Sequence, residues 1–212
     1  MGGFFSLDSG FMRAMSRIAD LIILNVIYLV TCLPVVTIGA ASTAMYTVCF
    51  RMGTAREGSL VKGYFQAFRD EFRQATLVWL FLLLFGAASC VNIFIFLGTS
   101  GWMHYLFFLF VLFLVVVLMM AGYAFPLLSQ FRNDTKSVIR NALIFSVAYL
   151  PRTALIVVIN VFPWALLLTN PYLFLQAGFI WVVVYFAAAA YINTRLLKKV
   201  FAPYMEPEEE EK

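Results

Sequence analysis

Long, unbroken runs of apolar residues constrain this chain more than any other feature of its sequence. Residues 111–120 read Val-Leu-Phe-Leu-Val-Val-Val-Leu-Met-Met, and charged residues are confined to short clusters between such runs. Hydrophobic residues make up 63% of the sequence and charged residues 12%, against about 45–50% and about 25% in ordinary globular proteins. A water-soluble fold could not bury this much apolar surface, so the sequence predicts a polytopic membrane protein.

The apolar runs do not alternate with polar residues, as the strands of a membrane barrel would. The expected class is therefore all-α, a transmembrane helical bundle of about six spans, since a span needs about 20 residues. The expected spans are 18–33, 37–51, 75–97, 102–125, 153–168 and 171–193. The second is short and rich in small residues, so we expect it to pack against its neighbours rather than face lipid.

Proline marks two further boundaries. A break at Pro151 would leave residues 136–150 as an oblique or interfacial helix and would keep Arg152 out of the lipid core. Asn170 followed by Pro171 is typical of a helix start and is expected to open the last span. A single membrane domain is expected over residues 1–205, because no charged interval is long enough for a separate soluble domain. The acidic residues 206–212 predict a disordered tail.

Basic residues cluster on one side of this six-span arrangement. They lie before the first span, between the second and third, between the fourth and fifth, and after the last. The positive-inside rule then predicts that both termini are cytoplasmic. It also accounts for the net charge of +4 without a nucleic-acid partner; the lipid bilayer is the expected surrounding. The sequence does not indicate an oligomeric state.

Residues that carry chemistry are scarce. The sequence has no phosphate-binding loop, no His-Glu-x-x-His motif and one histidine, and its three cysteines lack metal-like spacing and are expected to be buried free thiols. We therefore expect no enzyme, cofactor or metal site. The rival class is a membrane-embedded hydrolase or lipid transferase that uses isolated polar groups such as Asp20 or Asn25. Asp20 lies about one turn from Arg17, and a local or interhelical ion pair at the inner boundary is favoured over the alternative, a proton site.

An amphipathic pattern occupies residues 61–73. Apolar residues at i, i+4, i+7 and i+11 predict a helix in the membrane interface, with Arg69, Asp70 and Arg73 toward the cytosol; the apolar positions are Val61, Phe65, Phe68 and Phe72. The hypothesis is a partner-docking helix, and the alternative is an anchor that only orients the chain. The residues proposed to dock a partner are Phe65, Phe68, Arg69, Phe72 and Arg73.

Residues 32–44 form the least ordinary stretch, with Pro34 and Gly39 five residues apart. A tight helical hairpin is favoured, and broken backbone that binds a ligand is the alternative. The candidate functional residues of this hairpin are Asn25, Pro34, Thr37, Gly39 and Ser42. Four amides lie within the expected spans, namely Asn25, Asn92, Asn160 and Gln176. Hydrogen bonding between helices is their favoured role, and the alternative is a polar path for a substrate.

These residues carry a resemblance to a known family. At several places the chain resembles the YesL-like family of bacterial integral membrane proteins. These are the motif Leu-Pro-x-x-Thr-x-Gly at 33–39, Asp20 with Asn25, residues 2–5 with Asp8, and the stretches 65–69, 74–76, 123–128, 140–142 and 150–153. Glu71 departs from the asparagine expected there. The resemblance implies a bacterial cytoplasmic membrane and an accessory role with ABC-transporter subunits in oligosaccharide uptake. The alternative is an independent small-molecule carrier or channel.

A weak internal echo occurs at an offset of about 77 residues. It aligns Val61, Phe68, Phe72 and Thr76 with Val138, Phe145, Tyr149 and Thr153. Repeated halves are common in transporters, but four loose matches in so apolar a chain favour coincidence.

Overall fold

Helices make up nearly all of the described chain. The computed structural model describes residues 10–54, 58–99 and 101–204, and these contain no β-strand. The α-helices are α1 (Gly10–Thr31), α2 (Ile38–Arg51), α3 (Leu60–Asp70), α4 (Phe72–Leu97), α5 (His104–Gln130), α6 (Thr135–Ala148), α7 (Leu150–Thr169), α8 (Pro171–Gln176), α9 (Gly178–Ile180) and α10 (Phe186–Phe201). A π-helical segment, Trp181–Tyr185, joins α9 to α10. The all-α prediction is confirmed. The acidic tail and the resemblance at residues 2–5 and 8 lie outside the described residues.

Within the described residues, five helices are long and apolar enough to cross a membrane. They comprise Ala14–Thr31, Phe72–Leu97, His104–Gln130, Leu150–Thr169 and Gly178–Tyr204. The second expected span is the exception, because the 14 residues of α2 extend only about 21 Å at about 1.5 Å per residue. Every residue of α2 from Gly39 to Phe50 is buried. The prediction that this segment packs against its neighbours rather than facing lipid is confirmed.

Helix α2 is the centre of the bundle, packed by α1, α3, α4, α5 and α10. Although α2 is short, the chain that follows it lies close to the first part of α1. A Cβ atom placed on Gly53, just after α2, would lie 3.8 Å from Nη2 of Arg17 in α1. Gly39 sits against α4 so closely that a Cβ there would overlap the carbonyl oxygen of Ala75. A methyl group cannot displace backbone cheaply, so the α2–α4 contact requires glycine at this position.

The two expected proline boundaries have different outcomes. Tyr149, at φ −117° and ψ 43°, separates α6 from α7, so the predicted break at Pro151 is confirmed. Asn170 caps α8 as predicted, and its side chain accepts a hydrogen bond from the Leu173 N–H at 3.1 Å. That helix ends at Gln176, however, and the last span begins only at Gly178. The last expected span is therefore interrupted at Ala177, and only its part from Gly178 onward belongs to the observed span.

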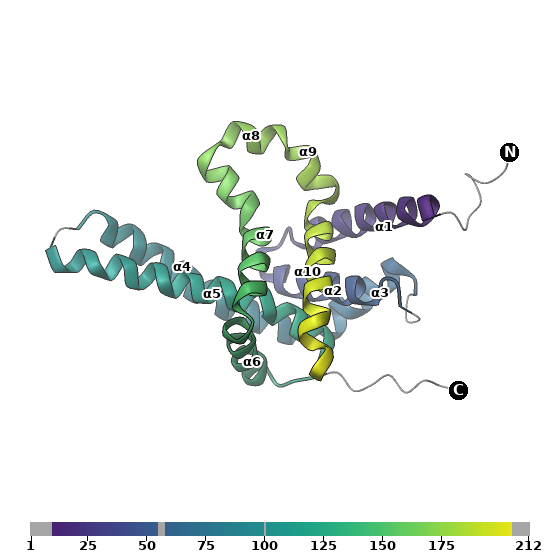
Figure 1. Cartoon of the computed structure of the whole chain (residues 1–212), viewed down its shortest axis with the longest axis horizontal. Coiled ribbons are helices and arrows are strands. Elements are labelled where there is room, and N and C mark those ends of the chain that lie inside the picture. Colours follow the sequence, from purple (N-terminus) through teal and green to yellow (C-terminus); the bar gives the residue numbers. More distant parts are fainter. Residues whose placement is uncertain (1–9, 55–57, 100, 205–212) are drawn as a thin grey trace.

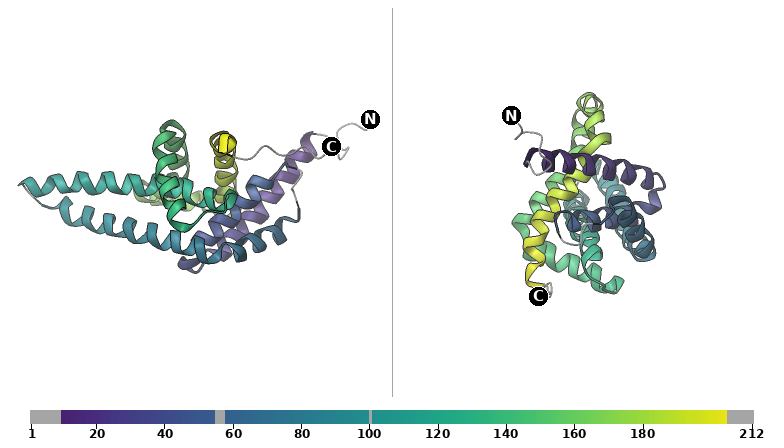
Figure 2. Two further views of the ribbon diagram at one scale, coloured as in Figure 1. Left: turned by 90° about the horizontal axis from the view of Figure 1, so that it is seen from below. Right: turned by 90° about the vertical axis from the view of Figure 1, so that its right-hand side faces the viewer.

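Two helical hairpins leave the centre in different directions. The α4–α5 hairpin extends to the left in Figure 1, while α7 to α10 extend upward. The left view of Figure 2 also shows α4 and α5 projecting together from the rest of the molecule. Their outer parts expose large apolar side chains, for example Phe94 at 82% and, on α7, Leu168 at 84%. These surfaces suit contact with lipid.

Candidate functional site

The predicted hairpin is accounted for by local structure. Pro34 has extended backbone (φ −76°, ψ 117°) between α1 and a short 3-10 turn, Val35–Thr37. The Thr37 hydroxyl lies 2.6 Å from the Thr31 carbonyl oxygen, which has no helical partner at the end of α1, and 2.7 Å from that of Pro34. Trp79 of α4 donates its indole N–H to the Val35 carbonyl at 2.8 Å. The Leu-Pro-x-x-Thr-x-Gly motif therefore builds a tight turn that docks on α4.

Asn25 of α1 does not take part in that turn, and its side chain bonds to another part of the chain. Its side chain is fully buried, and its Nδ2 donates to the carbonyls of Trp181 at 3.2 Å and Val182 at 2.6 Å. Its Oδ1 accepts from the Ala187 N–H at 2.9 Å. These backbone groups belong to the π-helical segment and the start of α10, where the regular ladder is interrupted. One amide of α1 thus stabilises the irregular part of the last span, as the favoured interhelical role predicts.

Helix α3 is the second predicted region, and its boundaries differ from the prediction. It ends at Asp70, Glu71 lies outside helical geometry at φ −97° and ψ 3°, and Phe72 begins α4. Phe72 and Arg73 therefore belong to the start of a long span rather than to the interfacial helix. The five residues proposed for docking still lie together, because α3 leads directly into α4.

A different face of α3 from the aromatic one, which is expected to lie in the membrane interface, packs on the protein. Tyr64 and Ala67 are buried, whereas Val61 and Phe65 are 43% and 49% exposed. The Tyr64 hydroxyl lies 2.6 Å from Oγ1 of Thr31 and donates to the Ala41 carbonyl at 3.4 Å. Burial raises the pKa of Tyr64 well above its usual value. The missed signal is a second stripe, Leu60, Tyr64 and Ala67, at i, i+4 and i+7.

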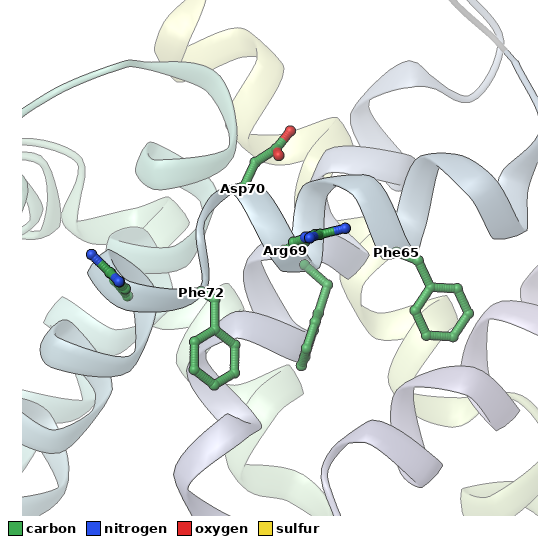
Figure 3. A pocket seen from close by; sticks show the side chains of 6 residues that line it. Phe65, Arg69, Asp70 and Phe72 are labelled. Atoms are coloured by element: carbon green, nitrogen blue, oxygen red, sulfur yellow. The ribbon is translucent and has the colours of Figure 1, made fainter.

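The exposed side of α3 and the start of α4 form an aromatic groove of about 670 Å³. Its lining residues are Phe65, Phe68, Arg69, Asp70, Phe72 and Arg73. Figure 3 shows Phe65 and Phe72 on the same side of the backbone, with Asp70 on the opposite side. All five predicted docking residues line this groove.

The aromatic groove carries two arginines, Arg69 and Arg73, and one acid, Asp70. No ion pair of Arg69 or Arg73 is found within the part of the chain that the structure describes. The rings order one another, since the Phe68 centroid lies 5.5 Å from that of Phe72 and 6.3 Å from that of Tyr64. An apolar surface bordered by two free guanidinium groups can receive an apolar side chain next to a carboxylate.

A separate polar pocket of about 350 Å³ lies between α1, α2 and α3 and includes Asp20, Arg51 and Lys62. The ion pair of Asp20 stays a prediction. In residues 10–54, 58–99 and 101–204 no group of three or more His, Cys, Asp or Glu could hold a metal ion.

Residues 21–93, about a third of the chain, match the family model described as "Protein of unknown function, DUF624". Over this stretch the chain is similar to DUF624. The matched region begins in α1 and ends in α4, so it includes the hairpin turn and the aromatic groove. No curated protein and no solved structure matches the chain.

Proposed function

We propose that this protein is an accessory subunit of a membrane transporter and that the aromatic groove docks the partner. The observation that carries the proposal is the groove itself, where three phenylalanines lie beside Asp70 and two arginines that form no ion pair with the described residues. Aromatic residues and arginine are enriched at protein interfaces and dominate their binding energy. The resemblance to YesL-like proteins supports an ABC transporter for oligosaccharides as the partner.

The chemistry of the groove defines what the partner should present. Phe65 is half-exposed, so burying it against an apolar side chain would contribute favourable free energy. Arg69 and Arg73 would then meet acidic groups at the edge of that contact. The proposed partner surface is therefore an apolar residue flanked by Asp or Glu, on the membrane-proximal part of a transporter subunit.

Charge reversal of the two arginines tests this proposal. In Arg69→Glu/Arg73→Glu, attraction becomes repulsion, so co-purification of the transporter subunit from native membranes should be lost. The matched control is Lys136→Glu/Arg140→Glu, which reverses two exposed charges on α6 outside the groove and should leave co-purification unchanged. Membrane insertion of both variants is checked by carbonate extraction. Absence of any transporter subunit with the unaltered protein would contradict the proposal.

The orientation forms part of the proposal. We infer a bacterial cytoplasmic membrane with both termini in the cytoplasm, supported by the basic clusters and by the return of the chain through α2 toward the start of α1. A membrane-impermeant thiol reagent applied to intact cells should label Thr99→Cys and leave Ser59→Cys unlabelled. The native thiols Cys32, Cys49 and Cys90 are free, and Cys90 is exposed rather than buried as expected, so all three are replaced by serine or alanine first. Labelling at Ser59→Cys alone would reverse the orientation.

An independent carrier is the second candidate, and a polar cavity within the bundle favours it. Purified protein in sealed vesicles should show no sustained sugar uptake if the accessory role holds. Uptake by this chain alone would favour the carrier. We also propose that the protein is not an enzyme, and substrate turnover lost in Asp20→Asn or Asn25→Leu would contradict that.

A further inference from the structure

A cavity of about 210 Å³ lies where α1, α2, α5, α7 and α10 meet. Its volume equals that of about seven water molecules at about 30 Å³ each. The hydroxyl and amide groups that line it are those of Tyr28, Ser42, Tyr46, Asn160 and Tyr185. None of the described residues that line it is charged. The cavity therefore has a mostly apolar lining into which several uncharged polar groups are set.

Several of these groups retain hydrogen-bonding capacity. The Tyr28 and Ser42 oxygens are 3.4 Å apart, at the long limit of a hydrogen bond. Asn160 donates from Nδ2 to the Ile156 carbonyl of its own helix at 2.9 Å, which leaves its second N–H available. Tyr185 donates to the Ile159 carbonyl at 2.7 Å, which leaves its oxygen able to accept.

Asn193 adds an unsatisfied group directly behind the lining. Its side chain is fully buried, and Nδ2 donates to the Tyr46 hydroxyl at 3.2 Å and to Oδ1 of Asn160 at 3.3 Å. Oδ1 of Asn193 has no partner in the described part of the chain. Turning the amide over would leave Nδ2 unpaired in place of Oδ1, so one polar atom stays unsatisfied in either orientation. A buried polar atom of this kind costs free energy unless another molecule supplies a partner.

We propose that this cavity is a binding site for a small, neutral, polyhydroxylated molecule. Ligand hydroxyls can both donate and accept, which matches the mixture of tyrosine, serine and amide groups. The aromatic rings of Phe125, Trp164 and Phe186 supply surface for the apolar C–H faces of such a ligand. An ion would have no counter-charge there and would be costly to transfer from water. The site does not depend on the docking function of the aromatic groove.

Equilibrium dialysis of the purified protein with radiolabelled polyols, from glycerol to sorbitol, tests this inference. Glycerol 3-phosphate is the charged comparator. At least one neutral polyol should bind saturably, and the phosphate ester should not. In Asn160→Leu the affinity should fall about tenfold or more, because ligand hydroxyls lose a partner in an enclosed site. Asn92→Leu is the matched control, since Asn92 also donates to the carbonyl four residues earlier but is partly buried on α4 and does not line the cavity.

Ser42→Ala removes one hydroxyl of the lining and provides a second test if Asn160→Leu fails to fold. It should weaken binding by a smaller factor and leave the elution profile of the protein unchanged. Three results would each overturn the inference. The first is no saturable binding of any neutral polyol, and the second is equal binding by Asn160→Leu and Asn92→Leu. The third is a co-purified lipid chain in the cavity that only detergent displaces. Loss of partner co-purification in the groove variants with polyol binding intact would separate the two proposals.

Discussion

The junctions α3–α4 and α6–α7 share a local plan but differ in what covers them. In each, a short helix leads through one residue with non-helical backbone, Glu71 or Tyr149, into a long span. At α6, the Phe145 ring lies 5.8 Å from that of Phe201 and 5.0 Å from that of Tyr204, both from the end of the chain's last span. At α3, no such segment of the described chain covers Phe65, which is half-exposed.

This difference indicates which aromatic surface serves the fold and which is available to a partner. The rings around Phe145 are part of the core, since Phe201 is fully buried. The groove on α3 has comparable aromatic chemistry, yet its outer rings gain little from the folded chain alone. The covered junction therefore contributes stability, and the open junction is the better candidate for binding.

The largest expected difference between the two regions is in stability, when one aromatic ring in each region is truncated to alanine. Phe201→Ala removes a fully buried side chain and should destabilise the protein by about 3–5 kcal/mol. Phe65→Ala removes a half-exposed ring and should cost less than about 0.5 kcal/mol in the isolated protein. Thermal unfolding of both variants in the same detergent measures the difference.

For partner binding, Phe65→Ala should have a larger effect than Phe201→Ala, the reverse of their effects on stability. Phe65→Ala should reduce co-purification of the transporter subunit, because aromatic anchors dominate interface energies. Equal loss of stability in Phe65→Ala and Phe201→Ala would show that the groove belongs to the core, and the comparison would fail.

Two threonines 77 residues apart sharpen the comparison within the spans. Oγ1 of Thr153 lies 2.8 Å from the Ser146 carbonyl oxygen and 3.1 Å from the Tyr123 hydroxyl, whereas Oγ1 of Thr76 is buried without a partner in the described chain. Thr153→Val should cost about 1 kcal/mol. Thr76→Val should be neutral or slightly stabilising, because it removes an unsatisfied polar atom. A similar loss in both variants would mean that Thr76 has a partner, such as water or a ligand.

Much of the helical fold could be predicted from the sequence because lipid imposes a simple rule on span length. The break near Pro151 and the cap at Asn170 were also predictable, since proline and asparagine act on their own neighbouring backbone. The bend at Ala177 and the π-helical segment were not. Backbone groups of the π-helical segment are satisfied by Asn25, which is more than 150 residues away, and local patterns carry no such pairing.

The candidate site was predictable in part for the same physical reason. The groove residues are neighbours along one short stretch, so their spacing placed them on one surface. Which stripe of α3 faces the protein depended on Tyr64 meeting Thr31 and Ala41, contacts that the sequence does not specify. The cavity could not be predicted from the sequence, because its polar groups come from four separate segments and each group alone is typical of an ordinary span.

Glu71 provides the smallest effect and the last test of the open junction. Partial burial, followed by the neighbouring charge of Asp70, raises the pKa of this carboxyl, and Arg132 opposes the rise. The folded state therefore holds the proton more tightly than the unfolded state does. Stability should fall as pH rises from about 4.3, the usual pKa of glutamate, through the raised folded value.

Glu71→Gln cannot ionise, so it should remove this slope and be no less stable than the unaltered protein at neutral pH. Unfolding midpoints measured from pH 4 to 7 check the expectation, with Asp134→Asn, an exposed acid outside the groove, as the control that should keep the slope. A slope of opposite sign, with stability lost toward acid, that disappears in Glu71→Gln and persists in Asp134→Asn would mean that Arg132 rather than burial dominates at the junction.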